Sequence, residues 1–61
     1  MSGAIIYRFC DTLIAAAHER RGIDRWPPGV AHRAVEAELK ARGYRIVQGE
    51  RGQWFAEKEK S

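Results

Sequence analysis

The first third of the chain carries hydrophobic residues at three- and four-residue intervals. Such spacing predicts an amphipathic helix, here over residues 4–21, with an apolar stripe of Ile6, Phe9, Cys10, Leu13, Ala16 and Ala17. The stripe is widened beyond one face by Ile5, Ile14 and Ala15. We therefore expect this helix to pack on more than one side or to form a dimer contact. Ser2 is its predicted N-cap, and Gly22 is expected to adopt the left-handed conformation that often follows a helix.

A second helix is predicted over residues 28–42, after a connection that contains Trp26 and two prolines. Proline is favoured in the first turn of a helix because its missing N–H needs no partner there. Pro27 or Pro28 is therefore expected to begin the helix, and Trp26 to cover the helix pair. The predicted inner side consists of Ala31, Ala34, Val35, Glu38 and Leu39. The outer side carries His32, Arg33, Glu36 and Lys40, and Gly43 is expected to end the helix in the left-handed conformation.

The C-terminal part alternates in the manner of two β-strands, residues 44–48 and 53–57, around the loop Gly49-Glu50-Arg51-Gly52. Pairing of Gln48 with Gln53 sets Ile46 opposite Phe55 on one face and Val47 opposite Trp54 on the other. One face is then expected to cover the helices and the other to meet something else. Residues 58–61 are polar and are expected to form a frayed tail.

These elements define an α+β fold: two helices followed by a C-terminal β-hairpin, in one small domain over residues 1–61. A domain of this size buries a small core. The single cysteine excludes an internal disulfide, and Cys10, His18 and His32 match no metal-ligand spacing, so no metal is expected. Cys10 lies on the apolar stripe and is expected to be buried. Because neither a disulfide nor a metal ion is expected to stabilise the small core, self-association is favoured, most simply as a homodimer.

Charge and composition narrow the class of protein. The chain has 61 residues, 44% of them hydrophobic and 31% charged, with a formal net charge of +3. The longest apolar run, residues 13–17, is too short to cross a bilayer, and no signal peptide is recognised, so we expect a cytoplasmic protein without a membrane partner. The positive charge favours weak attraction to a polyanion.

The segment of residues 30–57, VAHRAVEAELKARGYRIVQGERGQWFAE, resembles the recognition helix and wing of winged helix-turn-helix regulators of the GntR type. The shared features are a basic helix with an interior leucine, a glycine followed by a hydrophobic residue, and two strands around a glycine-containing tip. The resemblance implies a DNA-binding transcription regulator or accessory factor, with RNA as a further possible ligand. It implies that the second helix enters the major groove and that the nucleic-acid contacts come from His32, Arg33, Glu36, Lys40 and Arg51, with Arg20, Arg21 and Arg25 widening the phosphate footprint.

The same residues have a second interpretation. Glu36 with Lys40, and Glu38 with Arg42, are spaced to form ion pairs on an exposed helix. Such pairs keep an exposed helix soluble without contacting nucleic acid. The wide apolar side of the first helix and the two apolar faces of the hairpin then favour a phage- or plasmid-type interaction module that binds or inhibits a host protein without binding nucleic acid. Its expected partner interface consists of Ile5, Phe9, Ile14, Val47 and Trp54.

Catalysis has little support in the sequence. No phosphate-binding loop, nucleophile elbow or zinc motif is present, and no cofactor is expected. The C-terminal pattern is also similar to that of small toxin endoribonucleases that carry a histidine on the second strand. The matching positions here are Gly52-Gln53-Trp54, without histidine, so we expect the protein not to be an enzyme.

Overall fold

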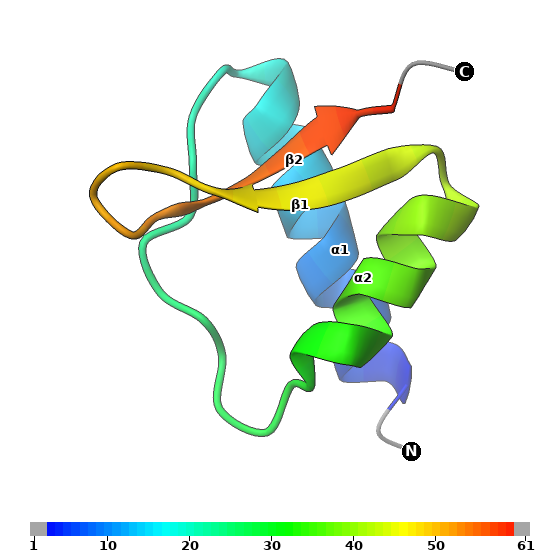
Figure 1. Ribbon diagram of the computed structural model, residues 1–61. Coiled ribbons are helices and arrows are strands. Elements are labelled where there is room, and N and C mark those ends of the chain that lie inside the picture. The colour runs from blue at the N-terminus through cyan, green and yellow to red at the C-terminus, as the bar shows by residue number, and fades with distance from the viewer. Residues whose placement is uncertain (1–2, 60–61) are drawn as a thin grey trace.

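The computed structural model describes residues 3–59. Helix α1 spans Gly3–His18, helix α2 His32–Ala41, strand β1 Tyr44–Gln48 and strand β2 Trp54–Lys58. The two helices pack against each other, and the antiparallel hairpin of β1 and β2 lies across them (Figure 1). The predicted α+β order, two helices followed by a hairpin, is confirmed. No helix in residues 3–59 is long and apolar enough to cross a membrane.

The core lies where the two helices meet the hairpin. Four of its fully buried side chains are Cys10 and Leu13 of α1 and Val35 and Leu39 of α2. The predicted burial of Cys10 is confirmed, and burial raises the pKa of its thiol. Arg42, just after α2, fastens the helices to each other by pairing with Asp11 of α1 and with Glu38, 2.8 Å away.

Helix α1 ends earlier than predicted, and a different residue takes the left-handed conformation that follows it. Its last turn is closed by hydrogen bonds from the Arg20 N–H to the Ala17 carbonyl and from the Arg21 N–H to the Ala16 carbonyl, both 3.0 Å long. This is the Schellman pattern, and its left-handed position is Arg20, with φ of 60°. The prediction for Gly22 is therefore wrong. The predicted N-cap, Ser2, lies outside the described residues.

Gly22 is required for a different reason, which is the close approach of the hairpin. A Cβ atom on Gly22 would lie 2.8 Å from Cζ of Phe55, and one on Gly49 would lie 2.6 Å from Cε1 of the same ring. Phe55 therefore packs over two glycines, one in the connection and one in the hairpin loop. The face of the hairpin that was expected to meet another molecule is partly covered by the chain itself.

Helix α2 begins later than predicted. Pro28 and Gly29 form a turn instead of the first helical turn, and the helix starts at His32. Ala31 is the N-cap, and it has no side-chain group to accept a hydrogen bond from the first turn. The end of the helix agrees with the sequence: Gly43 has φ of +84°, and its N–H donates to the Lys40 carbonyl.

The hairpin register differs from the predicted one by a residue. Gln48 pairs with Trp54, Val47 with Phe55 and Ile46 with Ala56. The reason lies in the loop, where the Gly52 N–H closes a turn on the Gly49 carbonyl and Gly52 takes φ of +81°. This glycine acts as a bulge that adds one residue to the loop.

The shifted register changes which side chains share a face, because side chains alternate between the two faces along each strand. Trp54 now lies on the face of Ile46 and Ala56, which packs against the helices. Lys58, expected in the tail, is the last residue of β2. The Glu59 N–H donates to the Gly43 carbonyl at 2.9 Å, and residues 60–61 lie outside the described part.

The connection between the helices also pairs with the hairpin. Ile23 forms an isolated antiparallel bridge with Trp54, through two backbone hydrogen bonds of 2.8 Å. The bridge occupies the edge of β2 that faces away from β1. It therefore attaches the connection, which runs along the side of the molecule away from most of α2, to the sheet (Figure 1).

Candidate nucleic-acid interface

Helix α2 has one buried side and one exposed side. Val35 and Leu39 are fully buried. The predicted contact residues His32, Arg33, Glu36 and Lys40 are all exposed, as is Ala37 between them. The intervals of three and four residues keep Arg33, Glu36 and Lys40 on one face, so the helix itself brings this part of the predicted site together.

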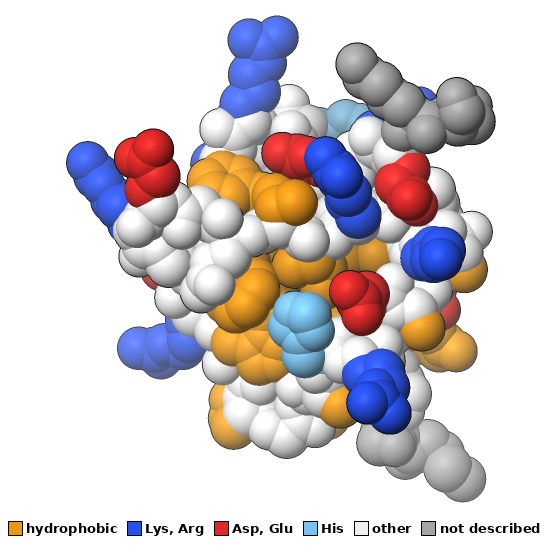
Figure 2. Space-filling model, in the orientation of Figure 1, with side chains coloured by type: hydrophobic (Ala, Val, Ile, Leu, Met, Phe, Trp, Pro, Cys, Tyr) orange, Lys and Arg blue, Asp and Glu red, His pale blue; other side chains and the backbone are white. Residues whose placement is uncertain are grey.

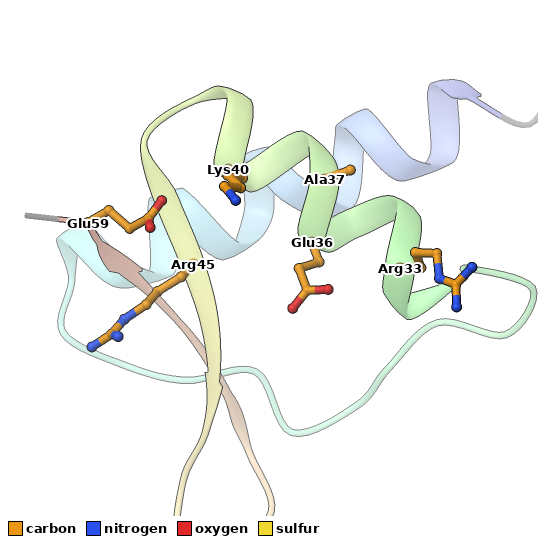
Figure 3. A pocket seen from close by; sticks show the side chains of 6 residues that line it. All are labelled: Arg33, Glu36, Ala37, Lys40, Arg45 and Glu59. Atoms are coloured by element: carbon orange, nitrogen blue, oxygen red, sulfur yellow. The ribbon is translucent and has the colours of Figure 1, made fainter. Parts of the chain in front are cut away.

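A groove of about 450 Å³ lies between this side of α2 and the hairpin. Its wall is completed by Arg45 of β1 and by Glu59, just after β2. In Figure 3, Arg33 and Arg45 point to opposite ends of the groove, with Glu36 and Lys40 between them. Three basic and two acidic side chains line it, so its charge is mixed and only slightly positive.

Two observations bear on the predicted ion pairs. Glu38 and Arg42 form the expected pair at 2.8 Å. Among the described residues no ion pair joins Glu36 to Lys40, so the Lys40 ammonium is not held by that carboxylate. Arg45 is not among the predicted contact residues, and it pairs with Glu57 across the hairpin at 3.0 Å. Its place two residues after the helix-ending glycine is the sequence signal that points to it.

His32 does not project freely from the helix. Its ring stacks on Trp26, with centroids 5.3 Å apart, and lies at the same centroid distance from Trp54. Trp26 in turn contacts Trp54 at 4.9 Å and the edge of Phe9 at 4.7 Å, and its indole N–H donates to the Val30 carbonyl at 2.7 Å. We call Phe9, Trp26, His32 and Trp54 the aromatic cluster. Figure 2 shows hydrophobic side chains gathered in the middle of the face that is in view, with charged side chains around them.

The remaining predicted arginines are spread over the molecule. Arg51 is exposed in the hairpin loop. Arg20 and Arg21 follow the C-terminal end of α1, which lies at the opposite end of the molecule from the start of α2 (Figure 1), and Arg21 pairs with Glu19 at 2.6 Å. Arg25 is exposed in the connection. The fold thus joins Arg33, Glu36 and Lys40 but leaves Arg20 and Arg21 apart from them.

The predicted partner interface is divided in a similar way. Phe9 is 6% exposed and belongs to the core. Trp54 and Ile14 are partly buried and pack against this core. Val47 is half-buried on the outer face of the hairpin, and Ile5 is 55% exposed. Self-association of the chain stays a prediction.

The described residues contain no group of three or more histidine, cysteine, aspartate or glutamate side chains placed to hold a metal ion. Comparison of the chain with protein-family models, with curated proteins and with solved structures finds no match.

Proposed function

We propose that the protein is a small DNA-binding protein, a transcription regulator or accessory factor, in which α2 enters the major groove of duplex DNA. The observation that carries the proposal is the division of α2 into a fully buried side, Val35 and Leu39, and an exposed side bearing Arg33, Glu36 and Lys40. The major groove of B-DNA admits an α-helix, and its base edges and phosphates are ligands for such side chains.

The hairpin supports the same proposal. It follows α2 directly, it is tied to the core through Ala56, and its loop carries the exposed Arg51. In the proposal, the hairpin takes the place of the wing that the resemblance to GntR-type regulators implies. With α2 in the major groove of DNA, Arg51 is the side chain that would reach the adjacent sugar–phosphate backbone of the DNA.

The mixed charge of the protein groove between α2 and the hairpin determines how strongly we expect DNA to bind. If Arg33, Lys40 and Arg51 each neutralise one phosphate, the logarithm of the affinity falls with the logarithm of salt with a slope of about −3. We therefore expect affinity for duplex DNA to fall by about 40-fold between 50 and 200 mM salt.

The test is fluorescence anisotropy with a labelled random-sequence duplex at these two salt concentrations. Arg33→Ala and Lys40→Ala are each expected to weaken binding and to reduce the salt slope by about 1. Arg8→Ala, which removes the same charge from an exposed position of α1, is the matched control and is expected to change little.

Two results would contradict the proposal. One is the absence of duplex binding at 50 mM salt. The other is an equal loss for Arg8→Ala and Arg33→Ala, which would indicate attraction to net charge without a site. A structured RNA of the same length, measured in parallel, tests whether the ligand is RNA instead.

A further inference from the structure

A second groove lies on the flank of α1 that faces away from α2. On the side toward α2, Asp11 pairs with Arg42, which follows α2, and the Sγ of Cys10 lies 3.9 Å from the Val35 carbonyl oxygen. Ile5, Arg8 and Thr12 recur at intervals of three and four residues on the other flank. The groove measures about 410 Å³ and is lined by Ile5, Arg8, Phe9, Thr12, Ile23, Arg25 and Pro27.

The walls of this groove are held in place by the fold. Ile23 is fixed to Trp54 by two backbone hydrogen bonds, and Phe9 is packed edge-on against Trp26. The Thr12 hydroxyl donates to the Arg8 carbonyl at 3.0 Å. The groove is therefore formed before any ligand arrives, which lowers the ordering cost of binding.

The groove is lined by apolar side chains and by two guanidinium groups. Its apolar side chains include Ile5, which is 55% exposed although it is a large aliphatic residue. The charged side chains that line it are Arg8 and Arg25, and no acidic residue among the described ones joins them. Apolar side chains together with two guanidinium groups are complementary to an aliphatic side chain flanked by carboxylates.

The same charges argue against a second copy of the chain as the occupant. A two-fold contact through this groove would set Arg8 and Arg25 of one copy against those of its twin. Like charges at an interface oppose association. An acidic partner relieves this repulsion, whereas a second copy does not.

We propose that this groove binds an acidic segment of a partner protein, which inserts an aliphatic side chain between Ile5 and Pro27 and sets carboxylates against Arg8 and Arg25. The residues of this surface are separate from Arg33, Glu36 and Lys40. The proposal therefore stands whether or not α2 binds DNA.

The probe is a displayed library of random twelve-residue peptides, selected against the wild-type protein. Selected peptides are then synthesised and titrated into isotope-labelled protein while amide resonances are followed by NMR. We expect the selected peptides to combine aliphatic and acidic residues and to shift the amides of residues 5–12 and 23–26. In variants of the same peptides, lysine replaces each acidic residue. These variants are expected to lose at least about tenfold in affinity.

Protein variants test the roles of the lining residues. Ile5→Ala and the double variant Arg8→Glu/Arg25→Glu are each expected to weaken the acidic peptides, and the double variant to favour their lysine counterparts. All three substituted positions are at or near the surface, so folding should be preserved, which circular dichroism checks. The control Arg33→Glu/Lys40→Glu should leave peptide affinity unchanged while abolishing duplex binding.

Several outcomes would overturn the proposal. They are selected peptides without an acidic bias, shifts that map to α2 or the hairpin, and dimerisation that Ile5→Ala abolishes in sedimentation equilibrium. Binding to anionic vesicles that is lost in Ile5→Ala, without any saturable peptide binding, would identify the surface as a membrane contact instead.

Discussion

The two helices are built in different ways. Helix α1 is the longer one, and it buries Phe9, Cys10, Leu13 and Ala16, so its position is set by contacts with α2 and with β2. Helix α2 buries only Val35 and Leu39 and exposes the opposite side. Their ends differ as well: α1 ends on a left-handed arginine, whereas α2 begins without a capping side chain and ends on a left-handed glycine.

This difference shows how a chain of 61 residues divides its tasks. Helix α1 is fixed by four buried side chains, whereas the shorter α2 is fixed by Val35 and Leu39 and leaves its other side exposed. Because α2 buries two side chains and α1 four, we expect hydrogen bonding at the helix ends to contribute a larger share of the stability of α2. Three sets of substitutions test this comparison.

The largest effect is expected where α1 leads into the connection. Gly22→Ala would place a Cβ against the Phe55 ring and Gln53, and we expect it to destabilise the protein by about 1–3 kcal/mol. Gly43→Ala, after α2, meets no nearby atom and acts only through its positive φ, at about 1–2 kcal/mol. Urea unfolding monitored by circular dichroism gives both values.

A double-mutant cycle separates the two causes. In a Phe55→Leu background the cost of Gly22→Ala should shrink, because the ring that opposes the Cβ is gone, whereas the cost of Gly43→Ala should be unchanged. Equal costs in both backgrounds would mean that Gln53, whose Cγ lies 2.9 Å from the same Cβ, opposes the substitution and that the Phe55 ring does not.

A gain of stability is expected at the start of α2. Ala31 has the extended conformation of an N-cap but no side-chain acceptor, so Ala31→Ser should stabilise the protein by about 1 kcal/mol. The same substitution at Ala37, inside the helix, should instead destabilise it by about 0.5 kcal/mol. Thermal unfolding of the two variants gives opposite shifts. A lower midpoint for Ala31→Ser would place the start of the helix elsewhere.

The smallest effect is expected at the end of α1. Arg20 has φ of 60°, a conformation that glycine adopts without steric cost, so Arg20→Gly should stabilise the protein by about 0.5–1 kcal/mol. Arg21 is the matched control, since it lacks a positive φ and pairs with Glu19. Arg21→Gly should lower the midpoint of thermal unfolding. A higher midpoint in both variants would contradict the explanation that glycine relieves steric strain at position 20.

The arrangement of elements follows from patterns that are local in the sequence. Three- and four-residue periodicity around Leu13 and Leu39, and alternation on either side of a glycine-rich loop, were sufficient to predict two helices and a hairpin. The details that differ depend on contacts between distant segments. Gly22 lies against Phe55, which is 33 positions later in the chain, and the left-handed position after α1 is Arg20. The shifted register comes from one added bulge at Gly52.

The candidate site could be predicted to a similar extent. Helical spacing was sufficient to group Arg33, Glu36 and Lys40 on one face. It could not reveal that His32 stacks on Trp26, because that contact depends on the path of the connection and on its bridge from Ile23 to Trp54. The groove on α1 was missed for the same reason, since Ile23 and Pro27 complete it only in the folded chain.

The aromatic cluster also gives the protein a single optical reporter. Trp26 and Trp54 are the only tryptophans in the chain, and their rings lie 4.9 Å apart, next to His32 of α2 and Phe9 of α1. The indole emission and the tryptophan bands of the near-ultraviolet circular dichroism therefore arise from one place where α1, the connection, α2 and β2 meet. Loosening of any of these elements around the aromatic cluster disturbs the same pair of indoles, so the tryptophan spectrum reports on the junction of all four.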